Sequence, residues 1–579
     1  METENRQCQN CRNSFAVEPD DFGFYEKMGL PVPTFCPRCR SQRRLSWRNN
    51  LSLYNRTCEL CKKSVVTLYS PESNITVYCN KCWWSDKWNP KDYAMEYDFS
   101  KPFFTQYREL VQKIPHMAIV NDNGIASTNC EYTHDCWFAK DCYMLFSAWR
   151  AENVMYGFLI AGANGRNIKD VVDCLNILDT NERIYECTSC EKSYQLKNSQ
   201  FCVSCVDSQF LYDCRACTDC FMCAGLRNKK YHFKNKEYSK EEYEKILAEY
   251  ETGTFSGVEK AQKEYDAFIL TYPRRYAYII QSMNCTGDIN TNCKNVRDSY
   301  GMIGAENCRY YDYGVSPKDS YDITMSGELS ECYENIVADH SSRNFFGIFS
   351  VKNQDVRYTQ HCHSSKHLFG CSQLRAGEYC ILNKQYSKEE YEELVPKVIE
   401  HMNAMPYIDK NGCEYRFGEF YPAELSPFGY NETVALDQIP ISKEEVLKKN
   451  FKWQDNPQMT VGKETMKPEQ IPDAIGAIPD SVTNEILACI ECKRNYKIIP
   501  NELTFYKKQQ IPIPRRCFHC RHHARILRRN PLELWHRSCM CEKASHQHQG
   551  KCPNEFETSY APERSEVIYC ESCYQKEIA

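Results

Sequence analysis

The sequence lacks any apolar run as long as a membrane span. A transmembrane helix needs about 20 consecutive apolar residues, and the longest candidate in this 579-residue chain is a short stretch at 154–163. The opening residues, METENRQCQN, also contain no apolar signal region. We therefore expect a cytoplasmic protein with no membrane partner. Its 37 cysteines would suggest disulfides in a small secreted chain, but here we expect reduced thiols.

The chain also lacks an overall positive charge. Its formal net charge is -5, which excludes a uniformly basic nucleic-acid coat. The charge is uneven, however, because two stretches contain no acid at all. Residues 27–58 carry seven basic side chains, and residues 507–532 carry eight. We expect each stretch to form a positive face.

Cysteine is abundant, and its pattern is repeated at the two ends of the chain. A shift of 481 residues superposes five N-terminal cysteines on five C-terminal ones without a gap, and a shift of 491 superposes two more. The superposed pairs are Cys8/Cys489, Cys11/Cys492, Cys36/Cys517, Cys39/Cys520, Cys58/Cys539, Cys79/Cys570 and Cys82/Cys573. The chain therefore carries two copies of one module.

Cysteines separated by two residues predict structural zinc sites. Zinc takes four thiolate or imidazole ligands in a tetrahedron, and two Cys-x-x-Cys turns complete one site. We expect about four Zn²⁺ ions bound by successive pairs, with cross-braced pairing of alternate turns as the alternative. The predicted ligands are Cys8, Cys11, Cys36, Cys39, Cys58, Cys61, Cys79, Cys82, Cys489, Cys492, Cys517, Cys520, Cys539, Cys541, Cys570 and Cys573.

The C-terminal copy departs from this pattern in its second site. Only one residue separates Cys539 from Cys541, and the insert that follows bears His546, His548 and Cys552. The sequence leaves open whether one of these three residues replaces Cys539 or Cys541 as a ligand.

The N-terminal motif also resembles a known family. CQNCRNSF, then FYEK, then PTFCPRCR is similar to the bacterial probable zinc-ribbon domain, over about residues 6–45 and more loosely over 487–526. The whole arrangement resembles cysteine-rich zinc-ribbon proteins of uncultured bacteria. The resemblance implies zinc binding and no particular activity.

Between the modules the sequence predicts a two-lobed, mainly β repeat region. Short Tyr-, Phe-, Val- and Cys-containing segments alternate with turn residues every eight to twelve residues, and eight residues within 223–243 recur 148 residues later. Both lobes end in YSKEEYE, which has the spacing of a helix capping box. This pattern favours a right-handed parallel β-helix with capping helices. The many middle cysteines either fill its core as small apolar groups or bind further zinc, and we favour packing.

The pattern predicts seven segments. They are a double zinc-ribbon module at 1–90, a helical connector at 91–116, a first β-solenoid lobe at 117–250, a helical connector at 251–276, a second lobe at 277–402, a proline-containing connector at 403–483 and a zinc-ribbon module at 484–579.

These features favour a non-enzymatic zinc-binding scaffold whose partner is nucleic acid, in particular RNA, or protein. The predicted phosphate contacts are Arg40, Arg44, Arg48, Arg521, Arg525 and Arg529. One alternative is a β-helix enzyme acting on carbohydrate, for which the candidate acids are Asp135, Asp141, Asp207, Asp213 and Asp219. Another is a zinc-dependent protein-interaction or redox-sensing protein.

Overall fold

The computed structural model describes residues 2–50, 52–161, 175–177, 193–455, 457 and 459–578. Its contacts divide the chain into two compact units, each built from separate segments. Unit 1 comprises Met1–Val120, Ala277–Pro457 and Pro531–Leu534, and unit 2 comprises Asn121–Tyr276, Gln458–Asn530 and Trp535–Ala579. The N-terminal cysteine module thus shares a unit with the second predicted lobe, and the C-terminal module shares one with the first.

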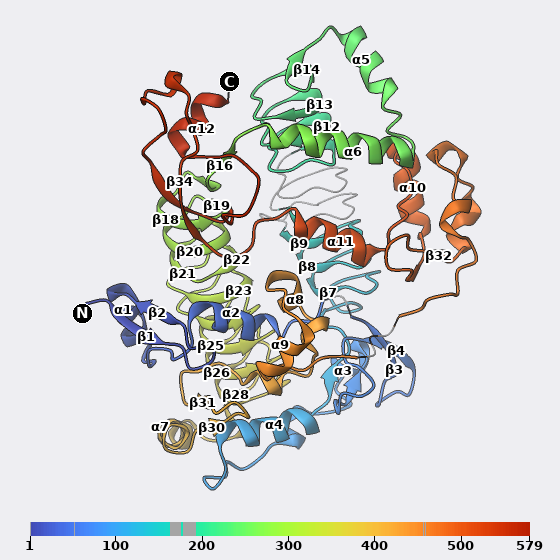
Figure 1. Ribbon diagram of the computed structural model, residues 1–579. Helices are drawn as coiled ribbons and strands as arrows, with labels where there is room; N and C mark the ends of the chain where they lie inside the picture. Colours follow the sequence, from blue (N-terminus) through green and yellow to red (C-terminus); the bar gives the residue numbers. More distant parts are fainter. Residues whose placement is uncertain are drawn as a thin grey trace. The chain divides into compact units, whose positions relative to one another are not determined.

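Unit 1 contains a long, mostly parallel sheet, here called stack 2, which runs from β17 to β29 (Figure 1). Its strands are β17 (Ile279–Ile280), β18 (Met283–Asp288), β19 (Asn290–Thr291), β20 (Lys294–Ile303), β21 (Glu306–Arg309), β22 (Asp312–Val315), β23 (Tyr321–Gly327), β24 (Tyr333–Ile336), β25 (Ser342–Ile348), β26 (Gln354–Gln360), β27 (Lys366–Phe369), β28 (Glu378–Ile381) and β29 (Lys384–Gln385).

The rest of unit 1 consists of short hairpins and helices. They are β1 (Glu4–Gln7), β2 (Ser14–Val17), α1 (Pro19–Met28), α2 (Pro37–Leu45), β3 (Tyr54–Thr57), β4 (Ser64–Thr67), β5 (Val77–Tyr78), α3 (Asn80–Trp83), α4 (Phe103–Lys113), β6 (His116–Met117), α7 (Lys388–Ala404), β30 (Tyr407–Ile408), β31 (Glu414–Tyr415), α8 (Val434–Gln438) and α9 (Lys443–Lys448).

Unit 2 contains a second set of mostly parallel strands, here called stack 1. The strands of stack 1 are β7 (His134–Trp137), β8 (Phe146–Trp149), β9 (Phe158–Ala161), β10 (Leu175–Ile177), β11 (Tyr194–Lys197), β12 (Val206–Tyr212), β13 (Thr218–Ala224), β14 (Lys230–Phe233) and β15 (Lys236–Glu237). The other elements of unit 2 are α5 (Lys240–Glu249), α6 (Phe255–Leu270), β16 (Arg274–Arg275), β32 (Leu487–Ala488), β33 (Asn495–Tyr496), α10 (Pro500–Gln509), α11 (Phe518–Leu527), β34 (Trp535–Ser538), β35 (Glu555–Thr558), β36 (Ile568–Tyr569) and α12 (Glu571–Glu577).

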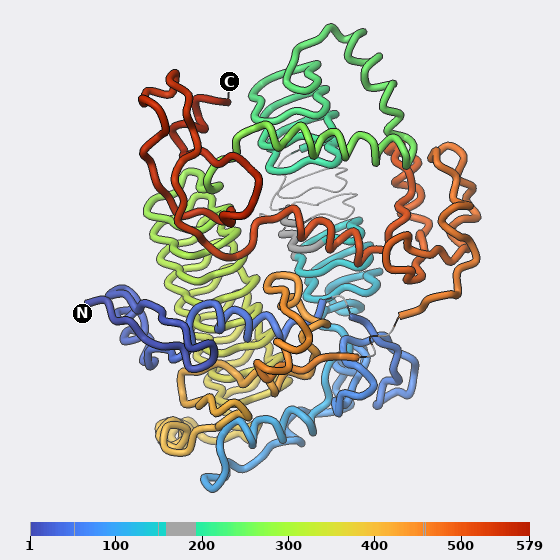
Figure 2. Tube along the Cα trace, viewed as in Figure 1, coloured from blue at the N-terminus to red at the C-terminus, as the bar shows by residue number. Residues whose placement is uncertain are grey.

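The prediction of a strand-rich fold with a parallel sheet of many strands is confirmed. Through most of both stacks, each strand residue pairs with the residue 12 positions later in the chain. Tyr321 pairs with Tyr333 in stack 2, and Val206 pairs with Thr218 in stack 1. The chain accordingly returns to the same face after each such period, as the winding of the segment 290–385 in Figure 2 shows.

Backbone geometry repeats within each turn of the stacks. From Asn307 to His367 every third residue has a positive φ, and each of these residues carries a Cβ. Left-handed conformations are unfavourable for residues with a Cβ, so the surrounding contacts must hold them in place. Every third position also points inward, and many of these residues are small or apolar, for example Val296, Cys308 and Cys332 in one buried cluster.

Hydrogen bonds inside the stacks explain why serine and cysteine share these inward positions. The Ser320 hydroxyl accepts the backbone N–H of Cys332, one turn later, at 3.2 Å and donates to the Lys318 carbonyl at 2.7 Å. The Cys332 thiol lies 3.4 Å from the Ser330 carbonyl, so it too contacts the carbonyl group two residues earlier in the chain. These hydroxyl and thiol groups therefore find partners within the stack, which offsets the cost of burying them.

Both stacks end at a helix with the predicted capping box. The Ser239 hydroxyl accepts the Glu242 N–H at 3.2 Å at the start of α5, and Ser387 accepts the Glu390 N–H at 3.1 Å at the start of α7. Helix α5 packs on β14 and α7 packs on β28. Within the described residues, each helix is too short or too polar to cross a membrane.

Candidate metal centres

The first cysteine cluster joins a hairpin turn to the start of a helix. Cys8 and Cys11 lie in the turn between β1 and β2, whereas Cys36 is the N-cap of α2 and Cys39 lies in its first turn. The four sulfurs lie within 4.8 Å of one another, and Cys11 Sγ is 3.7 Å from Cys36 Sγ. Two thiolates about 2.3 Å from one tetrahedral zinc ion would lie about 3.8 Å apart. The spacing therefore fits one ion.

The second cluster repeats this construction. Cys58 and Cys61 lie in the turn between β3 and β4, Cys79 caps α3, and Cys82 lies within that helix. Cys61 Sγ is 3.9 Å from Cys79 Sγ, and the Cys79 N–H lies 3.2 Å from Cys58 Sγ. The pairs are therefore brought together in sequence order, and the cross-braced alternative is not the arrangement observed.

The third cluster, in unit 2, is the counterpart of the first. Cys489 lies 3.7 Å from Cys520, and Cys492 lies 3.6 Å from Cys517, measured between sulfurs. Cys517 caps α11 as Cys36 caps α2. Burial raises the pKa of the Cys489 thiol, but backbone N–H groups around it lower that pKa overall, to about 7. The lowered pKa favours the thiolate form of Cys489, which is the form that binds a metal ion.

The fourth cluster differs from the predicted ligand set. Cys539, Cys570 and Cys573 are joined by Cys552 from the insert, and Cys541 is not one of these four. Cys552 Sγ lies 3.9 Å from Cys570 Sγ. With only Met540 between them, Cys539 and Cys541 lack the spacing of a two-residue turn, so the insert supplies the fourth sulfur instead. Cys541 belongs to a neighbouring group with His546, His548 and Cys573.

The middle cysteines are placed differently. Among the described residues, metal-type ligands come together in these five groups, and none of the groups includes a cysteine of the stacks. Cys205, Cys214, Cys217 and Cys220 are fully buried in one core cluster. The Cys214 thiol lies 3.5 Å from the Tyr212 carbonyl, two residues earlier, as the other inward thiols do. Cys187 and Cys190 lie outside the described residues.

The arginines predicted to contact phosphate in the N-terminal module are buried in unit 1. Arg40, Arg44 and Arg48 are 1%, 0% and 0% exposed. Arg40 Nη2 and Arg44 Nη1 each lie 2.9 Å from a different carboxylate oxygen of Asp322. An arginine neutralised inside the protein is not available to phosphate, so this arrangement does not present the predicted positive face.

Arg43, another of the seven basic residues at 27–58, completes the network. Its Nη2 atom lies 3.3 Å from Glu334 and 3.4 Å from Glu419. Burial raises the pKa of Glu334 to about 7, while Arg43 and Arg44 oppose this rise. The recurrence of an acid at equivalent positions of successive turns, Asp322 and Glu334, is the signal that could have revealed these partners.

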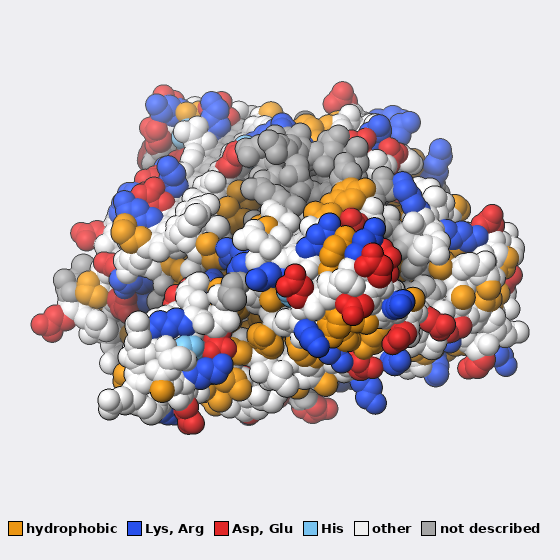
Figure 3. All heavy atoms as spheres, turned by 90° about the horizontal axis from the view of Figure 1, so that it is seen from above, with side chains coloured by type: hydrophobic (Ala, Val, Ile, Leu, Met, Phe, Trp, Pro, Cys, Tyr) orange, Lys and Arg blue, Asp and Glu red, His pale blue; other side chains and the backbone are white. Residues whose placement is uncertain are grey.

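The equivalent arginines of unit 2 are buried too. Arg521, Arg525 and Arg529 are 5%, 2% and 8% exposed. The Arg521 guanidinium lies 5.2 Å from the centre of the Tyr156 ring, and the Tyr156 hydroxyl donates to Glu502 at 2.8 Å. Both modules thus direct this helix toward a stack rather than toward solvent. On the face seen in Figure 3, Lys and Arg side chains are interspersed with Asp and Glu.

The acids proposed for a carbohydrate enzyme occupy structural positions. Each of the five has a positive φ and belongs to the three-residue repeat of the stack: Asp135, Asp141, Asp207, Asp213 and Asp219. Asp213 is fully buried and pairs with Arg227 at 3.1 Å. Asp is an ordinary residue in such turns, so their recurrence is explained without catalysis.

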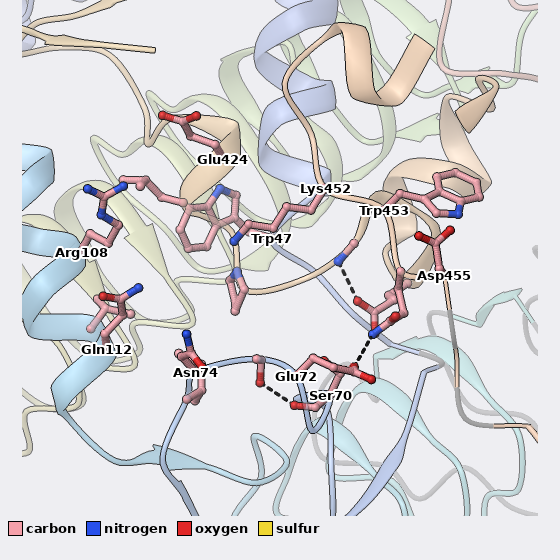
Figure 4. Close-up of a pocket in the computed structure, with 18 of the residues that line it drawn as sticks. Trp47, Ser70, Glu72, Asn74, Arg108, Gln112, Glu424, Lys452, Trp453 and Asp455 are labelled. Atoms are coloured by element: carbon pink, nitrogen blue, oxygen red, sulfur yellow. Dashed lines mark hydrogen bonds between the residues drawn. The ribbon is translucent and has the colours of Figure 1, made fainter. Parts of the chain in front are cut away.

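Unit 1 also contains a groove of about 440 Å³. It is lined by Trp47, Ser70, Glu72, Ser73, Asn74, Ile75, Tyr107, Arg108, Val111, Gln112, Glu424, Leu425, Pro427, Gly429, Glu432, Lys452, Trp453, Gln454 and Asp455. Figure 4 shows side chains of both charges around it. Lys452 donates to the Ser426 carbonyl at 2.6 Å, and burial lowers its pKa. The mixed charge does not select one class of ligand.

Comparisons with known proteins add little. A scan against protein-family models finds no match, and no curated protein matches the chain. Among solved structures, a candidate acetyltransferase from Desulfovibrio desulfuricans G20 is similar at 7% identity and a TM-score of 0.09, covering 49% of this chain and 81% of that one. A similarity at that score carries no argument about fold or function.

Proposed function

We propose that this chain is a non-enzymatic, zinc-dependent scaffold, in which zinc-ribbon-like modules hold two parallel β-helices in shape. The observation that carries the proposal is the buried network between α2 and stack 2. Helix α2 packs on β23 and β24, and its arginines pair with Asp322 and Glu334 at equivalent positions of successive turns. The metal would thus act on the stack through this helix.

The link from metal to stack is short. Cys36 caps α2, Cys39 lies in its first turn, and Arg40, Arg43 and Arg44 occupy the following turns. A bound ion would fix the start of this helix, and the helix would then fix the guanidinium groups. A structural zinc site supplies about 10 to 16 kcal/mol of folding free energy. Four cysteine sulfurs and no open position for substrate favour a structural role over a catalytic one.

Three features support a β-helix rather than a simple sheet. Most strand pairs are offset by the same period, positive φ recurs every third residue, and side chains of successive turns form one core. A chain that turns at each third residue and returns at a constant period closes a coil, so each turn buries its inward residues on the next.

The nucleic-acid hypothesis stays open, but the six predicted arginines are poor candidates for it. A contact with phosphate requires an exposed guanidinium, and all six are at most 8% exposed. Were RNA nevertheless the partner, binding would have to use other residues, and replacing Arg40, Arg44 and Arg48 would unfold unit 1 rather than change the salt dependence of binding.

The test is a metal measurement on the full chain. Zinc should copurify with the protein, and Cys36→Ser should remove one ion and weaken the folded state of unit 1. Cys214→Ser is the matched control, because it replaces a thiol outside the clusters. The proposal fails if the purified chain binds no zinc, or if Cys36→Ser keeps both its full zinc content and its stability.

A further inference from the structure

The insert of the C-terminal module places two complete sets of metal ligands side by side. One set is Cys539, Cys552, Cys570 and Cys573, and the other is Cys541, His546, His548 and Cys573. In each set the ligand atoms lie within 4.8 Å of one another, and Cys573 belongs to both. The N-terminal counterpart has a single set among its described residues, so the second one comes with the insert.

We propose that this module binds two metal ions joined by the Cys573 thiolate. One ion would have four sulfur ligands, and the other would have two sulfur and two nitrogen ligands. Both sets suit tetrahedral Zn²⁺. The described residues would then bind five ions, one more than the duplicated cysteine pairs predict.

The distances in the second set fit a common ion. Cys573 Sγ lies 3.5 Å from His548 Nε2, and Cys541 Sγ lies 3.1 Å from His546 Nδ1. A thiolate and an imidazole nitrogen on one tetrahedral zinc ion are about 3.5 Å apart, given bond lengths of about 2.3 and 2.0 to 2.1 Å. The first distance matches this value, and the second is slightly short.

The histidines are also oriented by second partners, as ligand histidines are. His546 Nε2 lies 3.1 Å from a carboxylate oxygen of Glu577, which leaves Nδ1 facing Cys541. His548 Nδ1 lies 2.8 Å from the Gly550 carbonyl, which leaves Nε2 facing Cys573. In both rings one nitrogen can donate to an oxygen while the other presents its lone pair to the thiol. Such outer partners fix the tautomer of metal-bound histidine.

Burial and chain geometry support the same conclusion. Cys541 and Cys573 are 0% and 1% exposed, and His546 is 7% exposed. The Cys552 N–H donates to the Cys541 carbonyl at 2.8 Å, which holds the two ends of the insert together. A histidine and two thiols buried within reach of each other can share one metal ion, which would replace the thiol–imidazole contacts with coordination bonds.

The experiment uses the full-length protein with Zn²⁺ and then with Co²⁺ as the probe. Wild type should bind five equivalents. His546→Ala combined with His548→Ala should bind four, and so should Cys541→Ser, which keeps the test valid if one variant folds poorly. In the Co²⁺ form a thiolate bridge couples the paired ions magnetically, so the low-temperature electron paramagnetic resonance signal should correspond to three uncoupled ions in wild type and four in either variant.

Two results would overturn the two-ion site. One is four equivalents in wild type and unchanged binding in both variants, which would make the second set a structural thiol–imidazole cluster. The other is five equivalents with five uncoupled Co²⁺ signals, which would exclude the bridge. Neither result affects the proposed scaffold function, because that function requires only the other three clusters and is contradicted by their loss of zinc.

Discussion

The Nη1 atom of Arg44 lies 2.9 Å from Oδ1 of Asp322, and both side chains are 0% exposed. Asp322 belongs to β23 in stack 2, whereas Arg44 belongs to the helix that begins at a zinc-type cysteine. This ion pair connects the N-terminal cysteine module to stack 2, which are separate segments of the sequence. The N-terminal cysteine module and the second part of the repeat region therefore belong to one unit.

Removal of one partner of this pair should be strongly destabilising. Asp322→Asn leaves Arg40 and Arg44 without their shared carboxylate, and a buried charge left unpaired costs about 3 to 5 kcal/mol. Denaturant unfolding of the full chain checks the value. Asp319→Asn is the matched control, because Asp319 is partly exposed and pairs with Lys27 at 3.2 Å, and exposed pairs contribute at most about 1 kcal/mol. Equal effects of the two changes would contradict the buried network.

Stability should depend on the pH through Glu334. Its pKa is raised to about 7 in the folded chain, against about 4.3 in an unfolded one. The folded state therefore holds this proton more tightly, and the resulting contribution to stability is complete below about pH 4 and lost as the pH rises to about 7. We expect Glu334→Gln to remove a decline on the order of 3 kcal/mol across this range.

The measurement is unfolding free energy against pH for wild type and Glu334→Gln, with zinc content determined at each point. Metal-bound thiolates also take up protons in acid, so only points at which both proteins retain the same zinc content are compared. Parallel curves would show that Glu334 does not titrate in this range.

A cysteine inside a stack should tolerate replacement by serine. Serine already occupies equivalent inward positions, such as Ser208, whose hydroxyl accepts the Cys220 N–H at 3.0 Å. We expect Cys214→Ser to cost no more than about 1 kcal/mol and to leave the zinc count unchanged. Loss of one ion on this substitution would show that the stack cysteines bind metal.

A bulky side chain at the same position should not be tolerated. Cys214 is fully buried among other inward residues, and extra methylenes in a packed core cost about 1 to 3 kcal/mol. Cys214→Leu should therefore unfold at lower denaturant than Cys214→Ser, by thermal or chemical denaturation. The reverse order would mean that this position is not in a close-packed core.

The clustering of the paired cysteines could be predicted from the sequence, because two Cys-x-x-Cys turns suit one tetrahedral metal site. The same spacing misleads in the stacks, where Cys214, Cys217, Cys220 and Cys223 are three apart because every third residue points inward. A local motif does not distinguish these causes. The repeat spacing could be predicted only as eight to twelve residues and not as one exact value, since inward positions accept cysteine, serine, valine, alanine and asparagine alike.

The burial of the arginines could not be predicted from the sequence, because a row of basic residues on a helix has the same sequence pattern whether it faces solvent or buried acids. Their partner Asp322 is 278 residues from Arg44 in the sequence, and Glu419 is 376 residues from Arg43. Only the folded chain shows that these charges meet. Cys552 is similar, since its role depends on how the insert folds back on Cys541.

Hydrogen exchange of the full chain with and without zinc tests the central claim most directly. Chelation should remove protection from α2 and, at the same time, from β23 and β24, where Asp322 and Glu334 lie. Strands β27 and β28, further along the same stack, are the internal reference and should lose less. If α2 loses protection after verified zinc removal while β23 and β24 keep theirs in full, the zinc module does not brace the stack.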